Sequence, residues 1–276
     1  MNYPPLRCNR CGASTPHPPY GLSAANRARR LCADCRRSTA RENGKARAKA
    51  LAAIAVGPEA RQVILGSVLG DGALEAPPKG QGGEWGLAIK HAKAQEPYLR
   101  WKAAKLGSLV RRVDTPEGRV RVRTVRHPVF TALAGERESV SDSFLAELGP
   151  LALAVWFYDD GNTTPPRVRP NGQQDKLAVR LSACAFSLPE IDRLRQAIHR
   201  LVGAETTVCS WRNPRDPSAP YRGIRLYAEN AEAFLRYVSQ VGEVPGVSYK
   251  VDTLNSGVTL RGVGMVPPER HLPCTP

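Results

Sequence analysis

Long hydrophobic runs are missing from this sequence. No stretch of 18 consecutive apolar residues occurs, which excludes a membrane span. The N-terminus, residues 1–5, lacks the basic-then-apolar layout of a signal peptide. Seven cysteines in 276 residues do not make a disulfide scaffold. These absences predict a cytoplasmic protein without a membrane partner. We expect it to be encoded by a bacterium or a phage, with an organellar origin left open.

Acidic residues are also scarce. Against 40 Lys and Arg there are 25 Asp and Glu, and the net charge is +15. Residues 1–61 hold 12 Lys and Arg but only 3 Asp and Glu, so much of the excess lies in the first fifth of the chain. Such an excess predicts attraction to polyanions, above all nucleic acid, although ribosomal and membrane-surface proteins share it.

The cysteines that are present are grouped. Residues 1–40 have few apolar side chains and contain two Cys-x-x-Cys pairs, formed by Cys8, Cys11, Cys32 and Cys35. Two pairs at this spacing are typical of a tetrahedral Zn²⁺ site, and without the metal so small a segment would lack a core. Chance spacing of thiols is the alternative. Residues 41–57 are basic and rich in alanine, which suits either contact with a phosphate backbone or a solvated linker helix.

The rest of the chain reads as two similar halves, residues 58–149 and 150–264, before a tail at 265–276. Each half opens with an apolar helix (near 59–71 and 151–161). In the first half a strand at 85–90, a helix at 96–110 and a strand at 119–123 follow. In the second half the pattern predicts a strand at 176–183, a helix at 188–202, strands at 206–212 and 221–227, and a helix at 231–241. The sequence therefore predicts an internal duplication, α/β (α+β) in class.

The predicted strands alternate between apolar and basic side chains. In Arg119-Val120-Arg121-Val122-Arg123 the arginines share one face and the valines the other. A basic ribbon of this kind fits the major groove of B-DNA, and the alternative is an ordinary sheet with solubilising arginines. Taken together with the segment at 90–102, the residues predicted to contact DNA are Lys90, Gln95, Arg119, Arg121, Arg123, Lys176, Arg180, Arg212 and Arg225.

Both apolar helices end in Asp-Gly, at Asp71 and Asp160, an offset of 89 residues. Gly66 and Gly70 lie one turn apart and would let a second helix approach closely. If the helices pack side by side, the two carboxylates emerge together, and their repulsion would be relieved by a divalent cation such as Mg²⁺. Asp159, next to Asp160, is expected to be structural or to support the metal ligands.

Residues 64–72 (ILGSVLGDG) and 153–161 (LAVWFYDDG) resemble the two signature helices of the LAGLIDADG homing endonucleases. The segment 90–102 (KHAKAQEPYLRWK) is similar to the family segment that follows the first strands. The resemblance covers about residues 60–255. It implies that Asp71 and Asp160 bind the catalytic metal and that Lys250 is the second-half lysine near the active site. The first-half lysine is not found at its expected place, where two alternatives stay open: Arg137 is its substitute, or the position is vacant.

The resemblance implies a monomer with the family's pseudo-twofold, duplicated αββαββα fold, which cleaves a long, partly asymmetric double-stranded DNA site with Mg²⁺ at the catalytic acids. The spacing of the cysteines adds Zn²⁺ in the N-terminal module. The chain ends carry no splice-junction chemistry, which predicts a free-standing or intron-encoded gene rather than an intein. Three alternatives stay open: a DNA-binding regulator with this fold but no catalysis, a maturase that binds intron RNA, and a structural zinc-ribbon nucleic-acid protein.

Overall fold

The computed structural model describes residues 6–8, 10–15, 33–80, 82–136, 139–168, 170–214, 216 and 218–252. The chain divides into two compact units, residues 1–54 and 55–276, and each is considered by itself. In the part of the chain that is described, no helix is both long and apolar enough to cross a membrane.

The first unit consists of a small hairpin and a long helix. Strands β1 (Leu6–Arg7) and β2 (Ser14–Thr15) pair antiparallel, and the turn between them carries the first Cys-x-x-Cys pair. Helix α2 (Ala33–Ala52) has nearly all of its described side chains exposed. The helix includes both Cys35 and the basic segment that begins at Arg41, so the segment 41–52 is helical.

The second unit begins with the first of two similar halves. Its sheet has the strand order β3-β4-β6-β5, with antiparallel neighbours. The elements of this half are α3 (Pro58–Leu69), β3 (Gly72–Glu75), β4 (Gly86–Ala92), α4 (Glu96–Leu106), β5 (Val110–Asp114), β6 (Arg119–Thr124), α5 (Pro128–Thr131) and α6 (Asp142–Glu147), with 3₁₀ turns η1 (Lys93–Gln95) and η2 (Gly107–Leu109).

The other half repeats this layout. Its sheet has the order β7-β10-β12-β11, so each strand occupies the place of its counterpart in the first sheet. The elements are α7 (Pro150–Asp160), β7 (Gly161–Thr164), β8 (Arg167–Val168), β9 (Gln174–Asp175), β10 (Ala178–Ser182), α8 (Leu188–Val202), β11 (Thr207–Trp211), β12 (Tyr221–Tyr227), α9 (Ala228–Ser239) and η3 (Ser248–Lys250). The predicted duplication and α/β class are confirmed.

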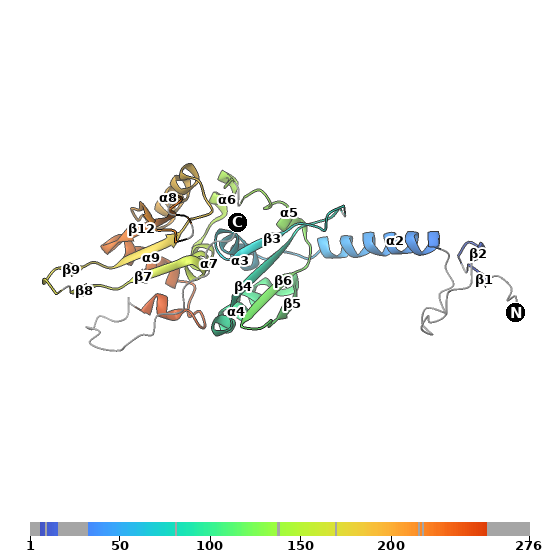
Figure 1. Cartoon of the computed structure of the whole chain (residues 1–276), viewed down its shortest axis with the longest axis horizontal. Coiled ribbons are helices and arrows are strands. Elements are labelled where there is room, and N and C mark those ends of the chain that lie inside the picture. The colour runs from blue at the N-terminus through green and yellow to red at the C-terminus, as the bar shows by residue number, and fades with distance from the viewer. Residues whose placement is uncertain are drawn as a thin grey trace. The chain divides into compact units, whose positions relative to one another are not determined.

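Helices α3 and α7 lie side by side between the two sheets (Figure 1). Small residues allow the close approach. A Cβ atom at Gly66 would lie 2.4 Å from the carbonyl oxygen of Ala152, and one at Gly70 would lie 2.6 Å from Cβ of Asp159. Both helices are buried almost all round, which explains why their apolar residues show no one-sided helical pattern.

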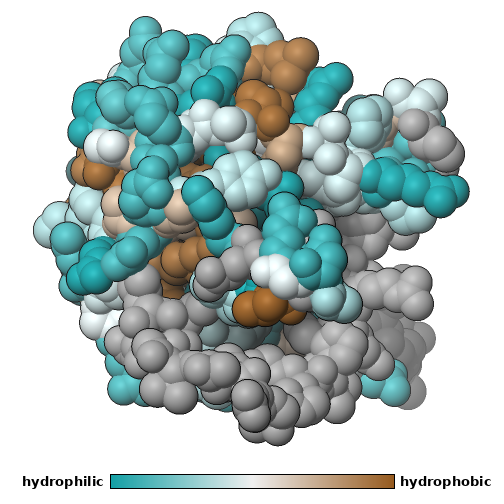
Figure 2. Space-filling model, turned by 90° about the vertical axis from the view of Figure 1, so that its left-hand side faces the viewer, coloured by the Kyte–Doolittle hydropathy of each residue, from teal (hydrophilic) through white to brown (hydrophobic). Residues whose placement is uncertain are grey.

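Each sheet has one buried face. In β6, Val120 and Val122 are fully buried whereas Arg119 is exposed, and in β12, Ile224 and Leu226 are fully buried. The predicted alternation of apolar and basic faces is therefore present. On the side of the molecule seen in Figure 2, hydrophilic residues cover most of the coloured surface and hydrophobic ones form only small separate groups.

Some expected element boundaries are wrong. The helix expected over 96–110 ends at Leu106, because Gly107 has a φ of +53° and the chain turns there into η2 and β5. The sequence pattern did not predict strands β3 and β7, which follow the Asp-Gly turns. Each has only four residues, too few for an alternation with a period of two to be recognised.

Candidate active site

The two predicted acids lie at the same end of the central helix pair. Asp160 is the last residue of α7, and Asp71 follows the C-cap Gly70 of α3. The side chain of Asp71 is 38% exposed, and Asp160 is half-buried. Burial raises the pKa of Asp160 well above its usual value, and the negative charges of Asp71 and Asp159 raise it further. The duplication thus brings an acid of each half into one electrostatic centre.

Asp159 is the buried acid of this centre. Its Oδ1 accepts hydrogen bonds from Lys102 Nζ at 2.5 Å and from the Tyr98 hydroxyl at 2.8 Å. Its Oδ2 accepts from the backbone N–H of Asp71 at 3.2 Å. The side chains of Lys102 and Asp159 are both 0% exposed. A carboxylate so deeply buried is stable only when paired, and here a lysine and two further donors satisfy it.

His91 of β4 lies between two carboxylates. Its Nδ1 is 3.3 Å from Oδ2 of Asp71, and its Nε2 is 3.7 Å from Oδ1 of Asp159. Burial lowers the pKa of His91 to about 3, and the nearby charge of Lys102 contributes to the shift. The imidazole is therefore neutral near pH 7 and carries one N–H, which it can donate to one neighbour at a time.

Lys250 is buried below the end of α7. Its ammonium group donates to the carbonyl oxygens of Tyr158 and Gly161, both at 2.8 Å, and approaches that of Phe157 at 3.4 Å. These carbonyls are at the C-terminal, negative end of the helix, where a cation is favourable. Burial lowers the pKa of Lys250 to about 8. The contacts place it as a clamp on the backbone that carries Asp160, and its catalytic role stays a prediction.

A lysine of the first half contacts the acid cluster. Arg137 lies outside the described residues, so its role stays a prediction, and Lys102 of α4 donates to the carboxylate of Asp159. A signal was available in the sequence, because Lys102 follows Tyr98 by four positions and Leu99 by three. It therefore lies on the apolar face of α4, where a charged residue requires a partner.

In the first sheet the predicted DNA-contact residues lie on neighbouring strands. Lys90 and Arg121 stand opposite one another in the β4–β6 ladder. Lys90 and Arg119 are exposed, and Arg123 is half-buried. Arg121 is engaged by Asp114 through two hydrogen bonds of 2.9 Å, so contact with a phosphate or base would compete with this pair. Gln95 hydrogen-bonds with the side chain of His91, so it lies close to the acid cluster.

In the second sheet Arg180 and Arg225 stand opposite one another in the β10–β12 ladder. The guanidinium of Arg180 lies 4.5 Å from the ring centre of Trp211, and that of Arg225 lies 4.8 Å from the ring centre of Tyr227. Aromatic rings hold these cations in place without neutralising them. Lys176 and Arg212 are exposed. Each half thus presents a sheet face that carries cations.

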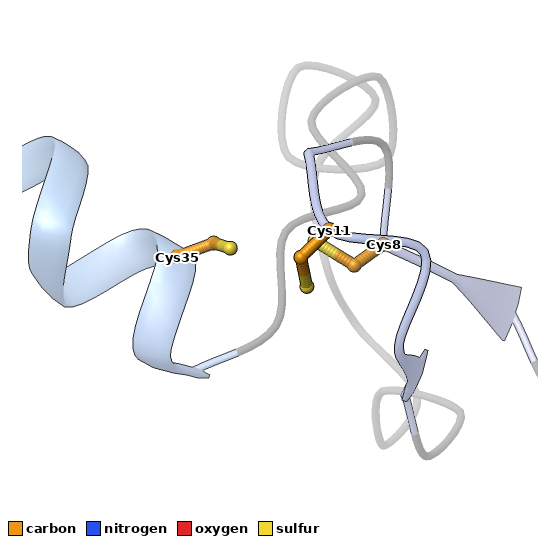
Figure 3. A group of neighbouring side chains, drawn as sticks. All are labelled: Cys8, Cys11 and Cys35. Atoms are coloured by element: carbon orange, nitrogen blue, oxygen red, sulfur yellow. The ribbon is translucent and has the colours of Figure 1, made fainter.

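Three of the four predicted zinc ligands come together in the first unit. The sulfur atoms of Cys8, Cys11 and Cys35 lie within 4.8 Å of one another. Figure 3 shows Cys8 and Cys11 in the hairpin turn and Cys35 pointing toward them from the first turns of α2. Arg10 joins the same two elements, with hydrogen bonds to Thr39 at 2.8 Å and to Glu42 at 3.0 Å. Cys32, the fourth predicted ligand, lies outside the described residues.

A protein-family model described as the LAGLIDADG DNA endonuclease family matches residues 61–212. The chain belongs to the LAGLIDADG DNA endonuclease family. The predicted family is confirmed. The matched region contains both Asp-Gly turns, the acid cluster around Asp159 and the basic face of the first sheet, whereas Arg225 of the second sheet lies beyond it.

Individual proteins are also similar to this chain, two in sequence and one in fold. The chain is 32% identical over 202 residues to "Protein RecA" of Mycolicibacterium flavescens, covering 69% of this chain and 45% of that protein. It is 31% identical over 144 residues to "Protein RecA" of Mycobacterium shimoidei, covering 49% of this chain and 33% of that protein. The chain thus spans less than half the length of these relatives. The solved structure of the homing endonuclease I-WcaI bound to its DNA recognition sequence has a TM-score of 0.54 at 16% identity, covering 72% of this chain and 88% of that one.

Proposed function

We propose that this member of the LAGLIDADG family is a site-specific homing endonuclease that hydrolyses phosphodiester bonds in duplex DNA with a divalent metal held by Asp71 and Asp160. The observation that carries the proposal is the position of these acids at one end of the α3–α7 pair, where burial and the negative charge of Asp71 raise the pKa of Asp160. Carboxylates that repel one another in a half-buried centre favour a bound cation.

The donor set fits Mg²⁺, which prefers carboxylate, water and phosphate oxygens. Asp71 and Asp160 would hold it, and the metal would supply activation of water and stabilisation of charge on the phosphoryl oxygens. The protein's own contribution is to orient the acids. His91 contacts the carboxylate of Asp71, and the side chain of Asp159 accepts a hydrogen bond from the backbone N–H of Asp71. Lys250 holds the turn after Asp160 through the carbonyl oxygen of Gly161.

The duplication also suits the substrate. The two strands of B-DNA are related by a twofold axis across the helix. The two halves of the protein are similarly related by a pseudo-twofold axis that would pass between α3 and α7. Each acid would therefore serve one strand, while the two basic sheet faces contact DNA on either side of the cleavage point. Because the halves differ in sequence, the target would be long and only partly symmetric, and a single chain would be sufficient to bind it.

The three cysteines brought together in the first unit support a structural Zn²⁺ site, completed by Cys32. Thiolates are the ligands that zinc prefers, and the joint between hairpin and helix is the place where a metal would hold a segment with almost no core. The exposed Arg41, Lys45, Arg47 and Lys49 of α2 would add phosphate contacts. The module would then raise affinity without taking part in hydrolysis.

A selection for cleaved DNA tests the proposal directly. A plasmid library of randomised duplex inserts is treated with the protein and Mg²⁺, and the ends produced are sequenced. We expect one long, partly asymmetric consensus and no cleavage in EDTA. Asp71→Asn and Asp160→Asn should each abolish double-strand cleavage, while binding of the selected duplex stays within about tenfold, or about 1.4 kcal/mol. Cleavage that persists in both variants would contradict the assignment, and tight binding without cleavage by the unaltered protein would favour a DNA-binding regulator.

A further inference from the structure

An ion pair joins the two halves at the active centre. Lys102 belongs to α4 of the first half and Asp159 to α7 of the second, and both side chains are 0% exposed. Their contact is 2.5 Å long. The internal duplication does not repeat this pair, because the residue that corresponds to Asp159 at the offset of 89 residues is Gly70.

The packing explains this asymmetry. A Cβ atom at Gly70 would lie 2.6 Å from Cβ of Asp159 and 2.8 Å from its Oδ2. The contact between the helix ends therefore has room for one side chain only, and it is occupied by the carboxylate of the second half. That carboxylate reaches across to the first half, where its partners are Lys102, Tyr98 and the backbone of Asp71.

Asp159 is linked to Asp71 both directly and through His91. Oδ2 of Asp159 accepts from the Asp71 N–H at 3.2 Å, and His91 lies between the carboxylates of Asp159 and Asp71. The last residue of α7, Asp160, is supported differently. Lys250, from the same half, binds the carbonyl oxygens of Tyr158 and Gly161 on either side of it. The two acids thus have separate supports.

We propose that Asp159, held in place by Lys102, is a positioning residue for Asp71, so that the second half of the protein sets the geometry of the first-half acid. The proposal rests on the proposed function, in which each acid serves one strand. Loss of the Lys102–Asp159 pair should therefore slow cleavage of one DNA strand more than the other, and loss of the Lys250 clamp should slow the opposite strand.

Strand-resolved cleavage tests this. A supercoiled plasmid carrying the selected target, and a duplex with a different label on each strand, are cut in Mg²⁺ under single-turnover conditions. Asp159→Asn should reduce the rate on one strand by about tenfold or more, the range expected when the support of a metal ligand is removed, and nicked plasmid should accumulate. The effect is weaker than that of Asp71→Asn, because the metal ligand itself remains.

Three further variants make the result decisive. Lys102→Met combined with Asp159→Leu leaves no unpaired charge, so this chain should fold, and it should slow the same strand as Asp159→Asn. Lys250→Met should slow the other strand. Lys105→Met is the matched control on α4: Lys105 pairs with Glu59 at 2.9 Å, away from the acids, and its loss should leave the strand ratio unchanged.

A purely structural role predicts a different outcome. Partial unfolding would lower the active fraction and reduce the cleavage rates of both strands equally. The inference would be overturned if Asp159→Asn and the double variant each slowed the two strands to the same extent. The inference is also wrong if the unaltered protein cuts the target and the ratio of the two strand-cleavage rates is the same in all of these variants. The proposed function would then still stand. If the unaltered protein cuts no duplex, the proposed function fails and the inference fails with it.

Discussion

Removing one member of the Lys102–Asp159 pair should cost far more stability than removing both. The two side chains are 0% exposed, so the contact belongs to the class of buried ion pairs rather than that of solvent-screened surface pairs. Breaking such a pair costs roughly 3–5 kcal/mol, because a charge is left buried without its partner, whereas replacing both members by apolar residues of similar volume is often close to neutral.

The contacts around the pair decide which single change is worse. After Lys102→Met, Asp159 still accepts from the Tyr98 hydroxyl and from the Asp71 N–H, so the loss should lie near the lower limit, about 3 kcal/mol. After Asp159→Leu, the ammonium of Lys102 keeps its place 4.6 Å from the ring centre of Tyr98 but loses its carboxylate, and the loss should approach about 5 kcal/mol. The double variant should lie within about 1–2 kcal/mol of the unaltered protein.

Urea unfolding followed by tryptophan fluorescence measures these differences. All four tryptophans, the first of which is Trp85, lie in the second unit, so the signal reports the catalytic unit and not the cysteine segment. The double-mutant cycle gives the coupling energy between the two positions. If the losses in the two single variants simply add in the double variant, the pair is not coupled and the reasoning is refuted.

Other predictions concern pH, packing, zinc and salt. The pKa of His91 is lowered from 6.5 to about 3, mainly by burial. Below pH 6.5 the imidazole is therefore protonated in the unfolded chain but stays neutral in the folded chain. Stability should therefore fall by about 2 kcal/mol between pH 6.5 and pH 5, and less in His91→Gln, as measured by unfolding at each pH without metal; an identical decline in both proteins would contradict the assignment. Gly66→Ala should destabilise the second unit by roughly 1–3 kcal/mol, because its Cβ would lie 2.4 Å from a backbone oxygen of α7, and an unchanged unfolding midpoint would show that the helices can separate. Replacing Cys32 and Cys35 by Ser should release one zinc per chain and weaken binding to a long duplex more than to a short one, with a nearly unchanged single-turnover rate; a collapse of that rate would mean that the cysteine module organises the catalytic centre. In a plot of the logarithm of the duplex binding constant against the logarithm of salt concentration, the slope should be steeper than about −3, which corresponds to more than about three neutralised phosphates. A shallower slope would contradict binding by the basic sheets.

Much of the architecture follows from local sequence patterns. The apolar helices with their Asp-Gly ends, the amphipathic helix α8 and the alternating strands β6 and β12 could all be predicted, because burial on one face leaves a periodic trace. The close helix contact at Gly66 was predictable for a similar reason, since two glycines one turn apart leave a strip without side chains. Short strands such as β3 and β7 could not be predicted, because four residues are too few to establish a period of two.

The candidate site was predicted only in part. By itself the sequence determined which acids the duplication relates to one another, Asp71 and Asp160, and which thiols have the spacing of a metal site. Tertiary structure alone decided the partners of Asp159, because Lys102 and Tyr98 are about 60 positions away and belong to the other half. A buried charge leaves no periodic signal that names its partner. Its energy depends on which donors the fold brings within hydrogen-bond distance, and here they come from α4, against which the end of α7 packs.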